Sequence, residues 1–374
     1  MELWIIGSTN DPKCGVAKYI REMIEQLNRY NLFPLTYNLD LRNGCIKYII
    51  DAIRILTSIK NRPSIVHLQY TPTTLGPLIT VIVFLLKRDG LKLIITLHEK
   101  PEGYLRRIKL GLLKRIFLLF ERSLINKCDI VIVHTEEHKN LISKYYKEVS
   151  KKVLIIEHNI PQRRKSEIIG ATSELGNELQ LLKNKKIIGF FGTFRPSKGI
   201  DILVKAFAEI SYNENLALLL AGRVRKTDKK YYSEILNLIK KFKIEDKVKI
   251  ILDVPDEDIS ELLQTMDIIT LPYLECTQSG VLFREIIPHM KPVVMSDVGG
   301  LGEAARAYGI GVVVQPGNPQ ALVDAILELL RNDDLRKKII LNQEKFCELM
   351  NQSKTPNGYA NLYMELLSPK AQNS

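Results

Sequence analysis

Hydrophobic positions along the first half of the chain alternate between short apolar runs and longer runs with helical spacing. The short runs are rich in β-branched residues and predict strands at 3–7, 33–37, 65–68, 91–97, 130–133 and 153–156. Strands that alternate with helices imply right-handed crossovers and therefore a parallel sheet. We expect this half to form one doubly wound α/β domain.

The same alternation resumes after a polar, poorly periodic region. It predicts strands at 187–191, 216–220, 248–251, 268–271, 293–295 and 311–314, followed by three helices between residues 320 and 367. Two sheets with separate crossovers do not easily share one core, so we predict two domains. The predicted boundaries are 1–165 for the first domain, 166–185 for a linker, 186–353 for the second domain and 354–374 for a final helix.

Length and composition fit this division. The 374 residues suit two domains, and contents of 45% hydrophobic and 26% charged residues indicate a globular protein rather than a disordered one. The longest uncharged apolar run, 75–86, is shorter than the roughly 20 residues that span a bilayer, so it predicts a buried helix. No secretory signal is visible, and the five scattered cysteines suit a reducing cytoplasm.

The net charge of +12 is confined to one half. Residues 1–170 contain 28 Lys and Arg against 16 Asp and Glu, a difference of +12, whereas the remainder contains 26 of each. Segment 100–127 is basic and amphipathic, which fits either a core helix with a solvated face or a peripheral contact with the inner face of an anionic membrane. No recognition fold or interleaved aromatic residues support a nucleic-acid partner.

Two turns in the second half favour a nucleotide site. Ser279 and Gly280 precede an apolar-periodic run and predict a helix start, where the amides of Ser279, Gly280 and Val281 would attract a phosphate. The next strand ends at Gly299 and Gly300. Either turn alone fits a plain connection, but adjacent parallel strands would place both turns at the ligand-binding edge of one sheet.

This stretch resembles the donor-nucleotide segment of the family-4 retaining glycosyltransferases, whose GT-B fold has two Rossmann-like domains facing a cleft. The motif P-Y-x-x-x-x-Q-S-G is matched at 272–280, and P-V-V-x-x-D-V-G-G-L-x-E at 292–303. The resemblance implies that Glu285 binds ribose hydroxyls and that the C-terminal helix crosses back to the first domain. Thr277 stands where many members have a second Glu. Pro288 and Met290 replace a regular helix end, so we expect a distorted last turn.

A third turn carries two cations. Gly192 and Gly199 bracket the segment that contains Arg195 and Lys198, between a predicted strand and a helix. Two exposed cations on a turn would need no ligand, but the string is similar to the R-P-x-K-G element of the same family. We expect Arg195 to grip two phosphate oxygens and Lys198 to act as a point charge on the leaving nucleoside diphosphate.

Two positions of the first half extend the resemblance. Gly15 lies in a string similar to the C-G-I-A-x-Y signature of one branch of the family, which implies a phosphate-facing amide. His98 matches the T-x-H-[DE] motif, which implies a contact to the donor sugar. We expect His67 to be a structural hydrogen-bonding residue, whereas His158 matches a hinge motif in which Asn159 replaces Gly. The histidine spacing suggests no metal site.

The sequence therefore predicts a hexosyltransferase that moves a sugar from a UDP or GDP donor to a glycan or lipid-linked acceptor. The resemblance implies retention of configuration, no metal, no cofactor and a role in glycan, glycolipid or polysaccharide assembly. The predicted catalytic residues are Lys198, Arg195 and His98, and the predicted nucleotide-binding residues are Gly15, Ser279, Gly280, Val281, Glu285, Gly299 and Gly300. Two alternatives stay open: a sugar-nucleotide epimerase of the same fold, and a non-catalytic membrane- or polyanion-binding protein. A dinucleotide oxidoreductase is disfavoured because no G-x-G-x-x-G follows a strand.

Overall fold

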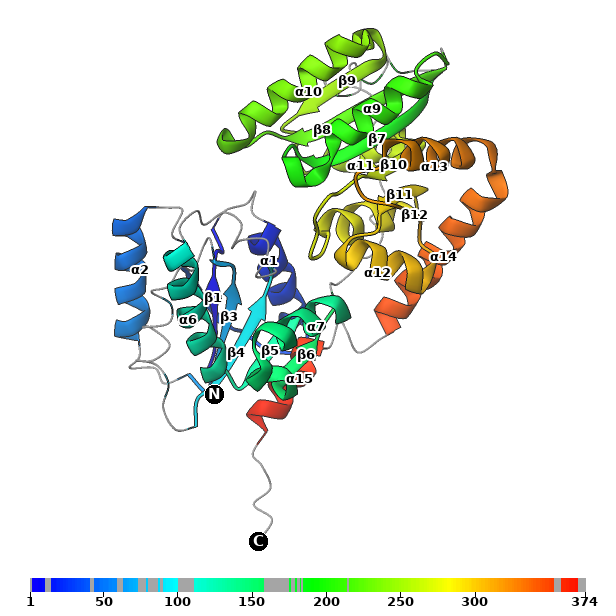
Figure 1. The fold of residues 1–374 in the computed structure, drawn as a ribbon. Coiled ribbons are helices and arrows are strands. Elements are labelled where there is room, and N and C mark those ends of the chain that lie inside the picture. Colours follow the sequence, from blue (N-terminus) through cyan, green and yellow to red (C-terminus); the bar gives the residue numbers. More distant parts are fainter. Residues whose placement is uncertain are drawn as a thin grey trace. The chain divides into compact units, whose positions relative to one another are not determined.

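The computed structural model contains two compact units, each built around its own six-stranded parallel sheet (Figure 1). Unit 1 comprises residues 1–158 and 353–374, and unit 2 comprises residues 159–352. The structure describes residues 2–10, 15–40, 44–58, 63–72, 79, 87, 90–99, 111–157, 175, 179, 182, 184–213, 215–352 and 358–368. Most of the predicted linker, 166–185, lies outside these residues. Its described leucines Leu175, Leu179 and Leu182 are buried in the core of unit 2, so they do more than connect the units.

The sheet of unit 1 has the strand order β2-β1-β3-β4-β5-β6. Its strands are β1 (Leu3–Gly7), β2 (Leu35–Asn38), β3 (Ile65–Tyr70), β4 (Lys92–Leu97), β5 (Ile130–Val133) and β6 (Val153–Ile155). Its described helices are α1 (Gly15–Asn28), α2 (Cys45–Thr57), α6 (Gly111–Lys127), α7 (Glu136–Tyr145), the short η3 (Lys147–Lys152) and α15 (Gly358–Leu367). Every residue of β1 and β3 is buried because helices cover both faces of the sheet, which is why these strands are continuous apolar runs.

Each face of this sheet packs on its own set of helices. One core contains Tyr48 and Ile55 of α2 with Leu124 of α6, and the other contains Ile20 of α1 with Tyr363 of α15. The final helix therefore returns to the first domain, as predicted. Its tyrosines also make polar contacts there, since the hydroxyls of Tyr19 and Tyr359 are 2.6 Å apart.

The sheet of unit 2 has the strand order β12-β11-β10-β7-β8-β9. Its strands are β7 (Lys186–Thr193), β8 (Leu216–Arg223), β9 (Val248–Leu252), β10 (Ile268–Leu271), β11 (Val293–Ser296) and β12 (Val312–Val314). Its helices are α9 (Ile200–Ile210), α10 (Lys229–Phe242), α11 (Ile259–Thr265), α12 (Gly299–Tyr308), α13 (Pro319–Arg331) and α14 (Asp333–Gln352). The short helical turns are η4 (Pro196–Lys198), η5 (Lys226–Asp228), η6 (Glu245–Lys247), η7 (Val281–Ile286) and η8 (Ile287–His289).

All twelve predicted strands are present, and both doubly wound sheets confirm the predicted fold class. In unit 2 the chain runs from β7 outward to β8 and β9, and then resumes on the other side of β7 at β10. Loops leave the carboxyl ends of β7 and β10 in opposite directions at this switch point, and open α/β sheets bind their ligands there. No helix among the described residues combines the length and the apolar character that crossing a membrane requires.

Candidate functional site

Three loops of unit 2 meet at the carboxyl edge of its sheet. They follow β7, β10 and β11, which are neighbours in the sheet. The Leu274 amide donates to the Ser197 carbonyl oxygen at 3.0 Å, and the Gly300 amide donates to the Thr277 carbonyl oxygen at 3.0 Å. The loop after β10 is therefore tied to both of the others, and the structure brings together the two glycine turns that the sequence singled out.

Two glycines make these close approaches possible. Gly199 and Gly299 have φ angles of 62° and 50°, in the left-handed region that disfavours side chains. A Cβ atom on Gly199 would lie 2.0 Å from the Pro272 carbonyl oxygen, and one on Gly299 would lie 1.9 Å from the Cys276 carbonyl oxygen. The loops could not pack this closely with any larger residue at either position.

Lys198 is buried at the centre of this edge. Its Nζ atom lies 3.3 Å from the centroid of the Tyr273 ring, which is itself fully buried. The pKa of Lys198 is lowered from 10.5 to about 7, chiefly by burial, with an opposing effect of Cys276 and smaller contributions from the charges of Arg195 and Arg225. An anion beside this ammonium would reverse the shift, so Lys198 is suited to gain a proton when an anion binds.

Other polar groups lie on the loops that meet near Lys198. Arg195 lies three residues before it in extended backbone, and within the described part of the chain neither Arg195 Nε nor Gln278 Oε1, both buried, has a hydrogen-bond partner. Arg225, in the loop after β8, also acts on the pKa of Lys198, although the sequence analysis did not single it out. The one feature of the sequence that pointed to Arg225 is its position just beyond a predicted strand. The sequence-predicted pair of cations is thus a group of three.

The segment after Ser279 differs from the regular helix that we predicted. Ser279 Oγ accepts a hydrogen bond from the Leu282 amide at 3.2 Å, as a capping residue does. Residues Val281–Ile286 form a π-helical turn and Ile287–His289 a 3₁₀ turn, after which Met290 has a φ of 52°. Pro288 has no amide hydrogen and so interrupts the helical ladder. The distortion therefore covers the whole segment, and little macrodipole can build up.

The remaining predicted nucleotide-binding residues lie around the same loops. Gly280 and Val281 begin the π-helical turn, and Glu285 lies half-buried within it, where its carbonyl oxygen contacts His289 Nδ1. Gly299 begins α12. The Gly300 amide donates to the Thr277 carbonyl oxygen and so ties two loops together, and its contact with a nucleotide stays a prediction.

Unit 1 places His98 at the carboxyl end of β4 in a chain of polar contacts. His98 Nε2 lies 2.8 Å from Gln69 Oε1, and His98 Nδ1 lies 3.4 Å from His134 Nε2. His134 Nδ1 donates in turn to the Ile156 carbonyl at 2.7 Å, and the Tyr19 ring packs edge-on against both imidazoles. Both ring nitrogens of His98 thus face protein groups that the sequence did not reveal, and a sugar contact would replace one of them.

His67 lies within β3, and Gly15 lies at the start of α1. His67 is fully buried between the hydroxyls of Thr96, at 2.7 Å, and Tyr363, and burial lowers its pKa to about 3. This is the structural hydrogen-bonding role that we predicted. Gly15 is the exposed first residue of α1. His158 and Asn159, the predicted hinge pair, lie outside the described residues.

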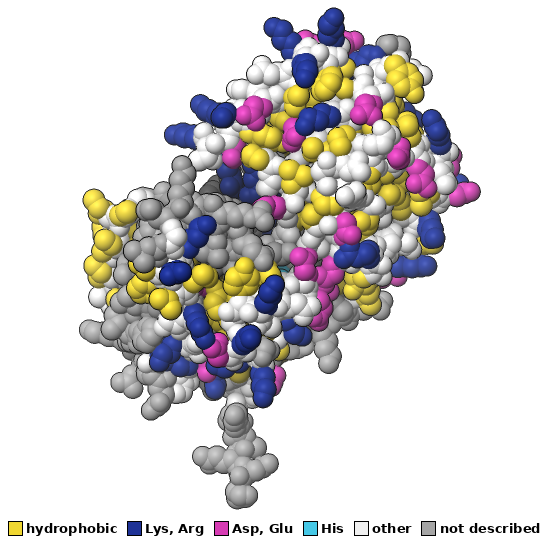
Figure 2. All heavy atoms as spheres, viewed as in Figure 1, with side chains coloured by type: hydrophobic (Ala, Val, Ile, Leu, Met, Phe, Trp, Pro, Cys, Tyr) yellow, Lys and Arg dark blue, Asp and Glu magenta, His cyan; other side chains and the backbone are white. Residues whose placement is uncertain are grey.

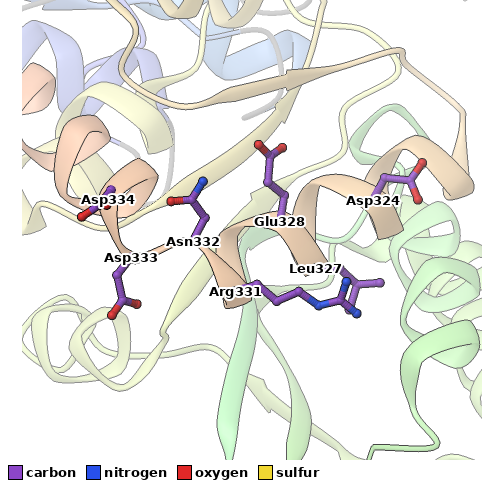
Figure 3. Close-up of a pocket in the computed structure, with 7 residues that line it drawn as sticks. All are labelled: Asp324, Leu327, Glu328, Arg331, Asn332, Asp333 and Asp334. Atoms are coloured by element: carbon purple, nitrogen blue, oxygen red, sulfur yellow. The ribbon is translucent and has the colours of Figure 1, made fainter.

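A hollow of about 750 Å³ lies elsewhere in unit 2, where α13 meets α14 (Figure 3). Its lining residues are Asp324, Leu327, Glu328, Arg331, Asn332, Asp333 and Asp334. Four carboxylates against one guanidinium would repel a phosphate. None of the predicted site residues lines this hollow.

Comparison with known proteins identifies both halves of the chain. Residues 172–346 match the family described as Glycosyl transferases group 1, and residues 30–161 match Glycosyltransferase Family 4. An uncharacterized glycosyltransferase of Methanocaldococcus jannaschii is 22% identical over 94% of this chain and 95% of its own length. The D-inositol 3-phosphate glycosyltransferase of Corynebacterium glutamicum (strain R) is 21% identical over 72% of this chain and 62% of its own length.

Solved structures show the same architecture. The Anabaena protein HepE in complex with UDP superposes with a TM-score of 0.75 at 16% identity, covering 98% of this chain and 100% of that one. Sucrose-phosphate synthase of Thermosynechococcus elongatus gives a TM-score of 0.76 at 17% identity, covering 98% and 99%. At such identities the likeness speaks for the fold alone. The two family matches show that the chain belongs to the family-4 glycosyltransferases, and the solved structures show that it has the GT-B fold of two Rossmann-like domains.

Proposed function

We propose that unit 2 binds a nucleoside-diphosphate sugar and that the enzyme transfers the sugar to an acceptor hydroxyl. The observation that carries this proposal is the grouping of Lys198, Arg195 and Arg225 where the loops after β7, β8 and β10 converge. A leaving nucleoside diphosphate gains negative charge as the glycosidic bond breaks. Fixed cations in a partly desolvated site stabilise that charge more strongly than water does.

The proposed roles follow from the chemistry of each group. Arg195 offers a planar fork for two phosphate oxygens, and Lys198, held over the Tyr273 ring, offers a compact charge. The amides of Gly280 and Val281 open a short turn toward the same edge, so they act as single donors rather than through a long helix dipole. Glu285, half-buried in that turn, is proposed to accept hydrogen bonds from ribose hydroxyls.

The donor and the stereochemistry are also proposals. The solved HepE complexes contain UDP and UDP-glucose, which supports a UDP-hexose donor here, with GDP as the alternative. Three cations at one edge of the sheet can neutralise the negative charge of the diphosphate, so we propose that transfer needs no metal. We further propose that the configuration is retained and that a leaving-phosphate oxygen takes the acceptor proton.

Unit 1 is proposed to bind the acceptor, a glycan or a lipid-linked molecule. His98 and Gly15 stay predicted contacts to the donor. We predicted that residues 100–127 contact an anionic membrane surface. The described part of that segment, α6, supports this contact because Ile116, Leu119 and Phe120 are exposed on it. Contact with the inner membrane surface would leave the enzyme cytoplasmic and peripherally bound.

The test is a turnover assay with UDP-, GDP- and ADP-sugars, with and without a mixture of glycan and lipid acceptors. We expect release of nucleoside diphosphate that requires acceptor, persists in EDTA and gives a product of the donor's anomeric configuration by NMR. Lys198→Ala should abolish release, whereas Lys337→Ala, on the exposed surface of α14, should not. Turnover without acceptor would identify an epimerase. Vesicle or polyanion binding that survives Lys198→Ala, without any turnover, would identify a non-catalytic protein.

A further inference from the structure

Helix α2 has two apolar faces, of which only one packs in the core that the described residues form. Its inner face, Tyr48, Ala52 and Ile55, is buried in the core that covers one side of the sheet. Its outer face carries four isoleucines that are exposed by 79%, 49%, 45% and 53%: Ile46, Ile49, Ile50 and Ile53. Spacings of three and four residues align these side chains along one side of the helix.

Such a stripe is unusual for a surface in water. Single exposed hydrophobic side chains are common, whereas a contiguous apolar patch marks an interaction site. In Figure 2 hydrophobic side chains line the edge of the molecule over α2, at the left of the view. The four side chains are purely aliphatic and offer no hydrogen-bonding group. Their natural environment is therefore hydrocarbon rather than a polar ligand.

Helix α6 presents a second stripe on the same layer. Leu124 of α6 is buried in the same core as Tyr48 of α2, so both helices cover the same face of the sheet. Ile116, Leu119 and Phe120 of α6 are exposed at spacings of three and four residues. Two amphipathic helices that cover the same face of the sheet thus both expose apolar side chains.

The charge of the sequence segment that contains α2 favours one partner. Residues 41–62 contain five Lys and Arg against one acid, Asp51, which pairs with Arg54 at 3.6 Å and is largely buried. A second copy docked through α2 would bring two segments of the same net positive charge together, which disfavours association. A layer of anionic lipid instead offers hydrocarbon for the isoleucines and headgroup charge for the flanking cations.

We propose that the outer face of α2 inserts into the surface of an anionic phospholipid membrane, with α6 as its companion. This inference extends the membrane contact proposed for α6, and it does not depend on the transfer chemistry of unit 2. Among the described side chains, α2 exposes four large apolar residues and α6 exposes three. The enzyme would then be held on the membrane by two helices of the unit that is proposed to bind the acceptor.

The test measures partition of the full-length protein onto vesicles of phosphatidylcholine with phosphatidylglycerol, and onto phosphatidylcholine alone. The variant Ile46→Gln/Ile49→Gln/Ile53→Gln keeps helix-forming residues and leaves the buried face intact. We expect the wild type to bind the anionic vesicles in preference and the variant to bind them at least about tenfold less. The matched control Leu341→Gln/Leu349→Gln removes two half-exposed leucines of α14 and should bind like the wild type.

Two further measurements keep the outcome decisive. Fluorescence of Trp4, the only tryptophan and fully buried in unit 1, should show that the α2 variant unfolds like the wild type. If Leu119→Gln/Phe120→Gln abolishes binding while the α2 variant still binds, the inference is overturned and the α6 contact stands. A wild-type dimer that the α2 variant converts to a monomer, with unchanged vesicle binding, would show self-association and also overturn it. Nucleotide binding in unit 2 should be the same in all variants.

Discussion

Replacing Lys198 with methionine should stabilise unit 2 while it removes nucleotide binding. Lys198 is 9% exposed, and its ammonium lies over the Tyr273 ring, where the charges of two arginines also act on it. Burying a charge without an anion costs free energy, and Met fills a similar volume without charge. Groups that a fold retains at such a cost are typical of functional sites, where activity and stability conflict.

The magnitude follows from the pKa of Lys198, which falls from 10.5 in an unfolded chain to about 7 in the fold. Between these values the unfolded chain holds the proton that the folded protein has lost. Wild-type stability therefore rises with pH by about 1.4 kcal/mol per unit across that window. Relative to that of Lys198→Met, the free energy of unfolding of the wild type should rise by about 2–3 kcal/mol between pH 7 and pH 9. Below pH 7 the free energy of unfolding of Lys198→Met should exceed that of the wild type by several kcal/mol. The attraction between the ammonium and the Tyr273 ring, which only the wild type has, should reduce this difference by about 1–2 kcal/mol.

Native-state hydrogen exchange measures this difference in unit 2 specifically. Amides of β7 and β10 report the opening of unit 2, and comparing variant with wild type at one pH cancels the intrinsic exchange rates. The control Lys337→Met alters an exposed lysine of α14 and should show no pH-dependent difference. If Lys198→Met destabilises unit 2, or if its difference from the wild type is the same at pH 7 and pH 9, the reasoning about a buried ammonium is wrong.

Two other substitutions test the packing around the candidate site and around the final helix. Gly299→Ala should lower the stability of unit 2 by more than about 1 kcal/mol and weaken UDP binding, because φ is 50° and the added carbon would collide with the Cys276 carbonyl. Gly111→Ala, which meets nothing within 4 Å, is its calorimetric control, and equal melting of the two variants would refute the steric argument. Tyr363→Phe leaves a nitrogen of buried His67 without its hydroxyl partner and should cost unit 1 about 1–3 kcal/mol in urea unfolding followed by Trp4 fluorescence. An unchanged urea midpoint would contradict that role.

Periodicity was sufficient to predict the two sheets because buried parallel strands leave a signal in the sequence. Strands such as β1 and β3 are covered on both faces, so they appear as short apolar runs with turn residues between them. The order of strands and helices then fixed which loops share a sheet edge. This is why the turns that carry Lys198, Ser279 and Gly299 could be expected to meet, although they are far apart in the sequence.

The details of the site depended on contacts that local patterns do not encode. The burial of Lys198 follows from its packing on Tyr273, which lies 75 positions later in the sequence. No residue close to Lys198 in the sequence predicts that contact. The π-helical turn after Ser279 required the fold as well, since Pro288 predicted a distortion only of the last turn. Gln69 and His134 became relevant only when β3, β4 and β5 were seen side by side around His98.

Calorimetric titration of UDP into the wild type and into Arg195→Ala/Lys198→Ala determines whether these cations hold a diphosphate. We expect the wild type to bind UDP and to take up protons near pH 7, because the anion raises the pKa of Lys198. The double variant should bind at least about 100-fold more weakly, with no such uptake, since two charge-assisted contacts are lost. Equal affinity in both proteins would place the nucleotide elsewhere and contradict the account.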